Sequence, residues 1–159
     1  MTSSGTAVVS LPSDTQISIS REFDAPRHLV YRAWTTPELV KRWWSARRGA
    51  VTVAEIDLRV GGRWRYVMVA EGGFEVGFHG EYREIVPNER LVSTEVYEGM
   101  PDAEALDTLT LTEVDGRTTA TLLVEHATRE HRDAHINSGM EDGMQDAMDL
   151  LEEVAVSVR

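Results

Sequence analysis

The chain has 159 residues, a size typical of one domain, and 42% of them are hydrophobic, which is enough to build a core. It contains no cysteine, which excludes disulfides, thiolate metal sites and a cysteine nucleophile. The net charge of −11 is concentrated in residues 101–159, which have 4 Lys/Arg against 14 Asp/Glu. We therefore expect no nucleic-acid partner, because such proteins present a positive surface.

The first residues resemble neither a signal peptide nor a membrane anchor. Residues 1–13 are rich in Ser, Thr, Gly and Val and lack a basic segment followed by an apolar run. Elsewhere no apolar stretch approaches the roughly 18 residues that a membrane span needs. We predict a cytoplasmic protein with no membrane partner, in which a disordered tail (1–14) precedes one domain (15–159).

Residues 15–23 alternate and predict a strand, with Ile17, Ile19 and Arg21 on one side. Asp24-Ala25-Pro26 then predicts the start of a helix, with Asp24 as its N-cap. Thr36-Pro37-Glu38 predicts a second short helix directly after the first. Two short helices in this position form a bracket and not a βαβ crossover.

Six further strands follow, joined by short turns that favour an antiparallel meander. Two of the turns are marked by Gly61-Gly62 and Asp115-Gly116, since these residues accept the positive φ angles of tight hairpins. The predicted strands span residues 51–58, 63–69, 74–86, 91–98, 107–114 and 118–126.

The C-terminal residues predict one long helix, from about 129 to 158, because apolar residues recur at steps of three and four. At about 1.5 Å per residue, it would be roughly 40 Å long. Its acidic side chains predict a solvated outer face: Glu141, Asp142, Asp146, Asp149, Glu152 and Glu153. Gly139 and Gly143 lie one turn apart in this helix, which indicates either close packing on the sheet or open volume for a ligand.

One face of the predicted sheet is aromatic and forms either plain core or the wall of a cavity. The residues on it are Trp64, Tyr66, Met68, Phe78 and Tyr82. Met140 and Met144 on the long helix suit an irregular pocket wall, and equally a core. His126 ends a strand with an apolar inner face, so it is either a core histidine or a polar anchor or acid–base group for a ligand.

Other polar groups give weaker signals. His131 and His135 have a spacing that can bind a metal, but the His-Glu-x-x-His base and a third ligand are missing, so we expect no metal site. Asp57 and the arginines at 59, 63 and 65 indicate either an ion-pair network at the double-glycine turn or recognition of an anion. Phosphate-loop and dinucleotide motifs are absent, and no cofactor is expected.

A series of short motifs runs along the chain in a fixed order. The motifs are Phe23-Asp24-Ala25-Pro26, Ala33-Trp34-Thr35, Pro37-Glu38-Leu39, Arg42-Trp43-Trp44, Asp57-Leu58-Arg59-Val60-Gly61-Gly62-Arg63-Trp64, Gly80-Glu81-Tyr82-Arg83-Glu84-Ile85-Val86-Pro87 and Glu89-Arg90-Leu91-Val92. Together they resemble the bacterial proteins similar to the C-terminal domain of the activator of heat-shock-protein-90 ATPase, a branch of the START/polyketide-cyclase (SRPBCC) superfamily.

The resemblance implies an α+β helix-grip fold over residue 15 to the C-terminus. Such a fold has a seven-stranded curved antiparallel sheet around a long C-terminal helix, two short helices after the first strand, and a cavity between sheet and helix. Members of the superfamily bind hydrophobic small molecules. Relatives often have a Gly-Trp pair in the last helix, where this chain has Gly143-Met144.

We therefore predict that the protein binds a hydrophobic small molecule in a cavity between the sheet and the C-terminal helix. The residues predicted to line it are Trp64, Tyr66, Met68, Phe78, Tyr82, His126, Met140 and Met144. A polyketide cyclase/aromatase-like enzyme is an alternative, and it would need a carboxylate or histidine with a shifted pKa in the pocket. A third candidate function is that of an interaction domain that activates a chaperone ATPase, although such activators contain another domain as well. The sequence leaves open whether the protein forms a homodimer.

Overall fold

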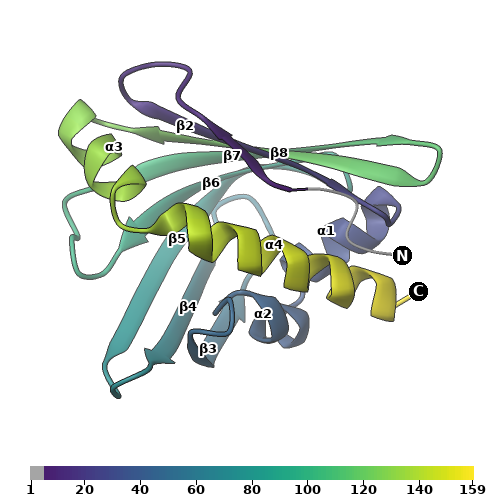
Figure 1. Ribbon diagram of the computed structural model, residues 1–159, viewed down its shortest axis with the longest axis horizontal. Coiled ribbons are helices and arrows are strands. Elements are labelled where there is room, and N and C mark those ends of the chain that lie inside the picture. The colour runs from purple at the N-terminus through teal and green to yellow at the C-terminus, as the bar shows by residue number, and fades with distance from the viewer. Residues whose placement is uncertain (1–5) are drawn as a thin grey trace.

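The fold is an antiparallel sheet wrapped around a C-terminal helix, as seen in a computed structural model that describes residues 6–159 (Figure 1). The strands are β1 (Val8–Ser10), β2 (Gln16–Phe23), β3 (Gly49–Ile56), β4 (Arg63–Ala70), β5 (Glu75–Val86), β6 (Arg90–Tyr97), β7 (Ala105–Val114) and β8 (Arg117–His126). The helices are α1 (Arg27–Thr35), α2 (Pro37–Trp43), α3 (Arg129–Ile136) and α4 (Met140–Ser157). The predicted α+β helix-grip class is thus confirmed.

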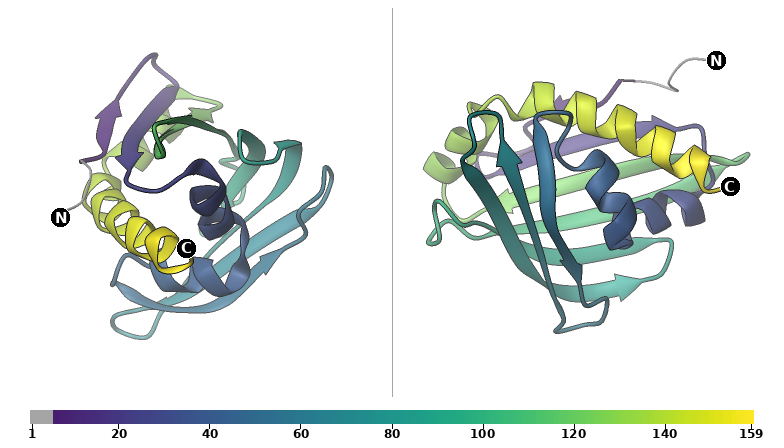
Figure 2. Two further views of the ribbon diagram at one scale, coloured as in Figure 1. Left: turned by 90° about the vertical axis from the view of Figure 1, so that its right-hand side faces the viewer. Right: turned by 90° about the horizontal axis from the view of Figure 1, so that it is seen from below.

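The strand order is β1-β2-β8-β7-β6-β5-β4-β3, and every neighbouring pair is antiparallel. β3 to β8 form the predicted meander, and β2 returns from the start of the chain to pair with β8. Register shifts between Val51 and Val53 and between Tyr82 and Glu84 mark bulges, which bend a strand and increase its twist. The resulting curved sheet surrounds α4 on one side, with α1 and α2 beside the helix (Figure 2).

The hairpin between β7 and β8 turns at the predicted residues. Asp115 has φ of 52° and Gly116 has φ of 77°, and Val114 pairs with Arg117 across the turn. Two positive φ angles in a two-residue loop define a type I′ turn, which matches the right-handed twist of the flanking strands. This turn fixes the register that directs Leu109, Leu111 and Val124 into the core.

The sheet has eight strands within the described residues and not the predicted seven. The additional strand is β1, whose residues Val8–Ser10 pair with Ser18–Ser20 of β2. The backbone of Ala7 is also held, because the Gln145 side chain accepts its N–H (2.9 Å) and donates to its carbonyl (2.6 Å). The predicted disordered tail over 1–14 is therefore wrong for this segment, while residues 1–5 lie outside the described residues.

The C-terminal region contains two helices instead of the predicted single long helix. α3 ends after Ile136, and α4 begins after Gly139, whose φ of 85° is left-handed. A left-handed glycine interrupts the helical hydrogen-bond pattern, and Ser138 Oγ closes the end of α3 by donating to the carbonyl of His135 (2.6 Å). The 18 residues of α4 therefore extend about 27 Å, and α3 lies apart at one end.

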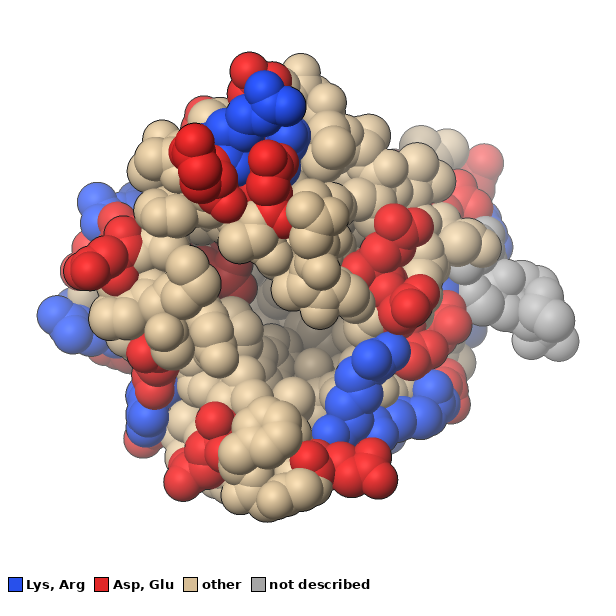
Figure 3. Space-filling model, turned by 60° about the vertical axis from the view of Figure 1, so that its left-hand side comes forward, with Lys and Arg blue, Asp and Glu red and all other residues tan. Residues whose placement is uncertain are grey.

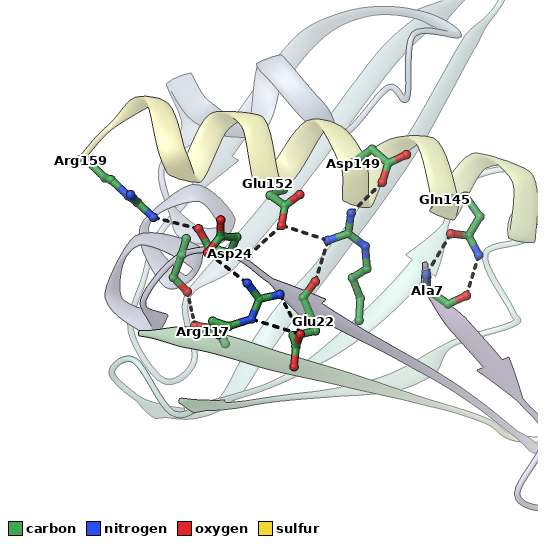
Figure 4. Close-up of polar contacts among 11 residues, drawn as sticks. Ala7, Glu22, Asp24, Arg117, Gln145, Asp149, Glu152 and Arg159 are labelled. Atoms are coloured by element: carbon green, nitrogen blue, oxygen red, sulfur yellow. Dashed lines mark hydrogen bonds and ion pairs between the residues drawn. The ribbon is translucent and has the colours of Figure 1, made fainter. Parts of the chain in front are cut away.

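α4 is fixed to the sheet by a buried arginine as well as by apolar packing (Figure 4). The Arg21 side chain on β2 is 1% exposed and forms ion pairs with Asp149 (2.7 Å) and Glu152 (3.7 Å) on α4. Glu152 also accepts the backbone N–H of Asp24 (2.8 Å). The predicted solvated acidic face is therefore wrong at Glu152, which is buried because it provides a counter-charge to Arg21.

The bracket formed by α1 and α2 begins differently from the prediction. Pro26 occupies the N-cap position of α1, and no side chain caps this helix. Asp24 instead contacts Arg117 on β8 through its carboxylate (3.2 Å). For α2 the prediction holds, since Thr36 precedes Pro37 in the first turn. No helix in residues 6–159 combines the length and the apolar character needed to cross a membrane.

Candidate ligand-binding site

A cavity of about 400 Å³ lies between the inner face of the sheet and the helices α2 and α4. Seven of the eight residues predicted from the sequence line it: Trp64, Tyr66, Met68, Phe78, Tyr82, Met140 and Met144. The eighth, His126, lines an adjoining cavity of about 390 Å³ beside α3. In a space-filling view from the side of α3, the molecule is hollowed and mostly uncharged side chains border the hollow (Figure 3).

The two cavities meet at shared residues from the sheet and the helices. Val76 and Phe78 on β5, Glu95 on β6, His135 on α3 and Met140 on α4 line both. The break between α3 and α4 lies at this junction, since His135 precedes it and Met140 follows it. The loss of a continuous helix is thus what places a histidine and a methionine on either side of the junction.

Glycine at position 143 keeps the α4 wall open. A Cβ atom built on Gly143 would have Arg48 Nε as its nearest neighbour, at 3.9 Å, which is ordinary contact at the limit of range. Gly143 lines the first cavity together with Met144. Of the two readings of this glycine, open volume is therefore right and close packing on the sheet is wrong. Gly139 has a different structural role, since it lies at the break between α3 and α4.

Aromatic rings from α2 and the sheet form a continuous wall. Trp44 at the end of α2 contacts Tyr66 and Phe78, with ring centroids 5.4 Å and 5.5 Å apart, in edge-to-face geometry. Trp64 and Tyr66 are 4.8 Å apart on neighbouring positions of the same strand face. Such pairs rigidify the wall. In the sequence Trp44 stands out only as part of the Arg42-Trp43-Trp44 motif, and nothing there indicates that it faces the cavity.

A pair of carboxyl groups, Glu95 on β6 and Asp107 on β7, also lines the first cavity. Glu95 pairs with Ala105 across the strands, and Asp107 pairs with Ser93, so the two acids are diagonal neighbours on one face. Sequence reasoning missed them. The available signal was the alternation of residues 107–114, in which Asp107 has the same parity as the inward-facing Leu109 and Leu111.

The environment of this pair favours retention of protons. Burial raises the pKa of Glu95, and a hydrogen bond with Asp107 acts in the opposite direction. Burial, the charge of Glu95 and the same hydrogen bond raise the pKa of Asp107 well above its usual range. Burial likewise raises the pKa of Tyr66 far above that of a free phenol, with smaller contributions from Tyr82 and Glu95. The polar centre of the cavity therefore contains phenols and a carboxyl pair whose surroundings disfavour ionisation.

Two histidines contact each other at the second cavity. His126 Nε2 and His135 Nδ1 are 3.0 Å apart. Burial, and then the charges of His135, His131 and Arg132, lower the pKa of His126 to about 4, and burial lowers the pKa of His135. Both rings are therefore neutral at pH 7. Within residues 6–159 no group of three metal-ligating side chains exists, so the histidines there have no third ligand.

The polar cluster at the double-glycine turn divides into separate pairs. Arg59 contacts Asp57 (2.9 Å), as the ion-pair prediction requires. Arg65 instead donates to both oxygens of Glu98 (2.9 Å each) on the outer face of the sheet. Hydrogen bonds from Arg65 and His79 lower the pKa of Glu98 to about 2. These groups strengthen the outside of the sheet and do not line either cavity.

Replacing Asp107 with Asn is expected to change how stability depends on pH. Raised pKa values mean that the folded protein binds more protons than the unfolded chain above about pH 4. The pair's contribution to stability is therefore complete below about pH 4 and declines as pH rises through the folded pKa values. Asp107→Asn should flatten this decline and stabilise the protein at pH 7 by about 1 kcal/mol, because the amide donates to Glu95.

Urea unfolding between pH 4.5 and 8 measures this difference. His126 has the opposite dependence, since its lowered pKa gives stability that is complete above about pH 6.5 and is lost as the pH falls towards 4. That slope is common to both proteins, so it cancels when the variant is compared with the parent. Parallel pH profiles would contradict the assigned protonation of the carboxyl pair.

Comparisons with known proteins find one matching family and similar solved structures. A family described as "Activator of Hsp90 ATPase homolog 1-like protein" matches residues 24–155. A crystal structure of a protein from Rhodobacter sphaeroides is 29% identical, with a TM-score of 0.90, over 96% of this chain and 99% of that one. A crystal structure of a protein from Nitrosomonas europaea is 25% identical, with a TM-score of 0.84, over 93% and 98% of the two chains. A comparison with curated proteins finds no match.

Proposed function

Because the chain belongs to the family of Activator of Hsp90 ATPase homolog 1-like proteins, we propose that it binds a hydrophobic small molecule in the cavity between the sheet and α4. The observation that supports this most is the first cavity, whose aromatic wall faces a helix that has glycine at position 143. Its volume of about 400 Å³ lies in the range of roughly 300–1,000 Å³ typical of ligand pockets.

The composition of the wall supports an apolar ligand with few polar groups. Tryptophan, tyrosine, phenylalanine and methionine provide 11 of the 24 lining residues, and alanine, valine and leucine provide another six. Such side chains provide burial, and a small number of polar groups then determine orientation. The acidity of residues 101–159 also argues for a small molecule over a nucleic acid or an anionic membrane surface.

Met144→Trp is expected to weaken binding of a neutral environment-sensitive dye, such as Nile red, by at least about tenfold, or about 1.4 kcal/mol. Met144 lines the cavity next to Gly143, and the indole ring would occupy the volume that the dye needs. Because the cavity is open there, the unfolding free energy should stay the same or rise, whereas overpacking a filled core costs about 1–3 kcal/mol.

Dye fluorescence titration and thermal unfolding of the same samples measure the two effects. Val156→Trp is a matched control, because Val156 is 40% exposed on α4 and lines neither cavity. That variant should bind the dye as the parent does. A Met144→Trp protein that is destabilised and binds dye normally would show that Met144 belongs to a filled core.

An enzyme of cyclase type is a second candidate, because Glu95 and Asp107 supply what it requires. They are carboxyl groups in the pocket with raised pKa values, the property that suits general acid–base catalysis near neutral pH. Conversion of a bound compound by the parent protein, and not by Asp107→Leu, would distinguish an enzyme from a binding protein.

A further inference from the structure

The first cavity contains a hydrogen-bond donor with no acceptor. Trp64 is 7% exposed and lines the cavity, and its indole Nε1 has no hydrogen-bond partner among residues 6–159. Trp43 shows the usual arrangement for comparison, since its Nε1 donates to the carbonyl of Ala33 (2.9 Å). A buried indole N–H normally finds a partner, and leaving a buried donor unpaired is costly. The Trp64 N–H is therefore available to a bound molecule.

The same cavity contains a hydrogen-bond acceptor with no donor. Asp107 Oδ1 is fully buried, and no N–H or hydroxyl group among the described residues donates to it. Asp107 has the more strongly raised pKa and holds the proton of its hydrogen bond with Glu95, but each carboxyl group has two oxygens with several lone pairs. The pair therefore retains acceptor capacity that residues 6–159 do not satisfy.

A row of residues across four adjacent strands brings these two groups to one region. Trp64 on β4 pairs with Gly80 on β5, β5 pairs with β6, and β6 carries Glu95 beside Asp107 of β7. Gly80 has no side chain, and Trp64 Nε1 lies 2.5 Å from the position that a Cβ on Gly80 would occupy. The indole therefore extends over Gly80 towards β6, so its N–H lies on the side of the acidic pair.

We propose that this region binds a hydroxyl group, and that the ligand is a neutral aromatic alcohol of the phenol or naphthol class. A hydroxyl group donates one hydrogen bond and accepts others, so it satisfies the acceptor at Asp107 and the donor at Trp64 together. A ketone or ether oxygen satisfies Trp64 alone, and so does a carboxylate, because it has no proton to donate to Asp107. The aromatic wall of Tyr66 and Phe78 binds the ring.

This inference rests on the proposed function, since it concerns the chemistry of the ligand in the same cavity. Three probes of similar shape test it: 2-naphthol donates and accepts, 2-methoxynaphthalene accepts only, and 2-methylnaphthalene does neither. Calorimetric titration of the full chain should give an affinity for 2-naphthol about tenfold or more above that for the other two, or about 1.4 kcal/mol. Binding of all three probes, whatever their relative affinities, would support the apolar cavity as a binding site.

Variants assign the preference to the two groups. Trp64→Phe and Asp107→Leu should each bring 2-naphthol to within about threefold of 2-methylnaphthalene, while 2-methylnaphthalene itself still binds. Trp64→Phe keeps an aromatic ring but removes the unpaired N–H together with part of the buried ring volume, so its urea unfolding is measured beside its binding of 2-methylnaphthalene. Tyr31→Phe removes a hydroxyl on α1 outside both cavities and should leave the preference unchanged.

Failure of the hydroxyl site and failure of the apolar cavity give different results in these titrations. Equal affinity of the parent protein for the three probes would overturn the hydroxyl site and leave the apolar cavity in place as a binding site. Failure of all three to bind, together with failure of the dye, would overturn both proposals. A preference for 2-naphthol that survives in both Trp64→Phe and Asp107→Leu would place the hydroxyl group elsewhere, and so would also contradict this assignment.

Discussion

Arg21→Met is expected to lower the free energy of unfolding by about 3–5 kcal/mol, the usual cost of removing one member of a buried ion pair. The Arg21 side chain is 1% exposed and contacts Asp149 and Glu152 on α4. Methionine has a similar length, so packing is largely retained. What is lost is the counter-charge of Glu152, which is itself 7% exposed and would be left as a buried carboxylate.

Arg117→Met is the matched control on the neighbouring strand. Arg117 also pairs with two acids, Glu22 (2.8 Å) and Asp24 (3.2 Å), but its side chain is 34% exposed. Exposed pairs contribute about 0–1 kcal/mol, so this variant should unfold within about 1 kcal/mol of the parent. Adding Glu152→Leu to Arg21→Met should recover part of the loss, because no buried charge remains although the backbone N–H of Asp24 loses its acceptor. Equal effects of Arg21→Met and Arg117→Met in urea unfolding would refute the role given to burial.

Gly80→Ala is expected to destabilise the protein by about 3 kcal/mol, at the upper end of overpacking effects. A Cβ at this position would collide with the backbone carbonyl of Thr94 on β6 and with Trp64 Nε1. The carbonyl is part of the β6 backbone and moves only if the strands separate. The added methyl group would also displace the Trp64 indole, so naphthol binding should fall together with stability.

Gly77→Ala on the same strand separates the effect of the site from that of removing a glycine. A Cβ on Gly77 would meet the carboxylate end of Glu98, a side chain on the outer face that can move aside by giving up its surface hydrogen bonds to Arg65 and His79. The substitution should therefore cost about 1 kcal/mol or less, and naphthol affinity should be unchanged. Thermal unfolding and calorimetry of both variants measure the contrast. Similar losses in the two proteins would contradict a special close approach at Gly80.

The strand pattern could be predicted because alternation and turn residues are local properties. The meander from β3 to β8, the Asp115-Gly116 turn and the inward face of Trp64 and Tyr66 all follow from period-two spacing and positive-φ residues. β1 has only three residues and no apolar alternation, and its pairing depends on an available strand edge and on Gln145 of α4. Such long-range support leaves no local trace in the sequence.

The helix break and the acidic pair were missed for different physical reasons. Apolar residues continue at helical spacing through Gly139, so periodicity alone predicts one helix, and within such a helix the glycine indicates only close packing or open volume. Glu95 and Asp107 are far apart in sequence, and each one alone resembles an ordinary strand residue. Their proximity is a consequence of the β6–β7 register, which places them diagonally on one face.

The pairing of β2 with β8 has a kinetic consequence during synthesis of the chain. Ile17 pairs with Val124, 107 residues later, whereas Val114 pairs with Arg117 across a two-residue loop. Closing a loop of that length costs about 4 kcal/mol of chain entropy, and it happens only after β8 has left the ribosome. Until then a nascent chain that already contains β2 exposes Ile17, Ile19 and an unpaired strand edge, the combination that promotes aggregation between growing chains.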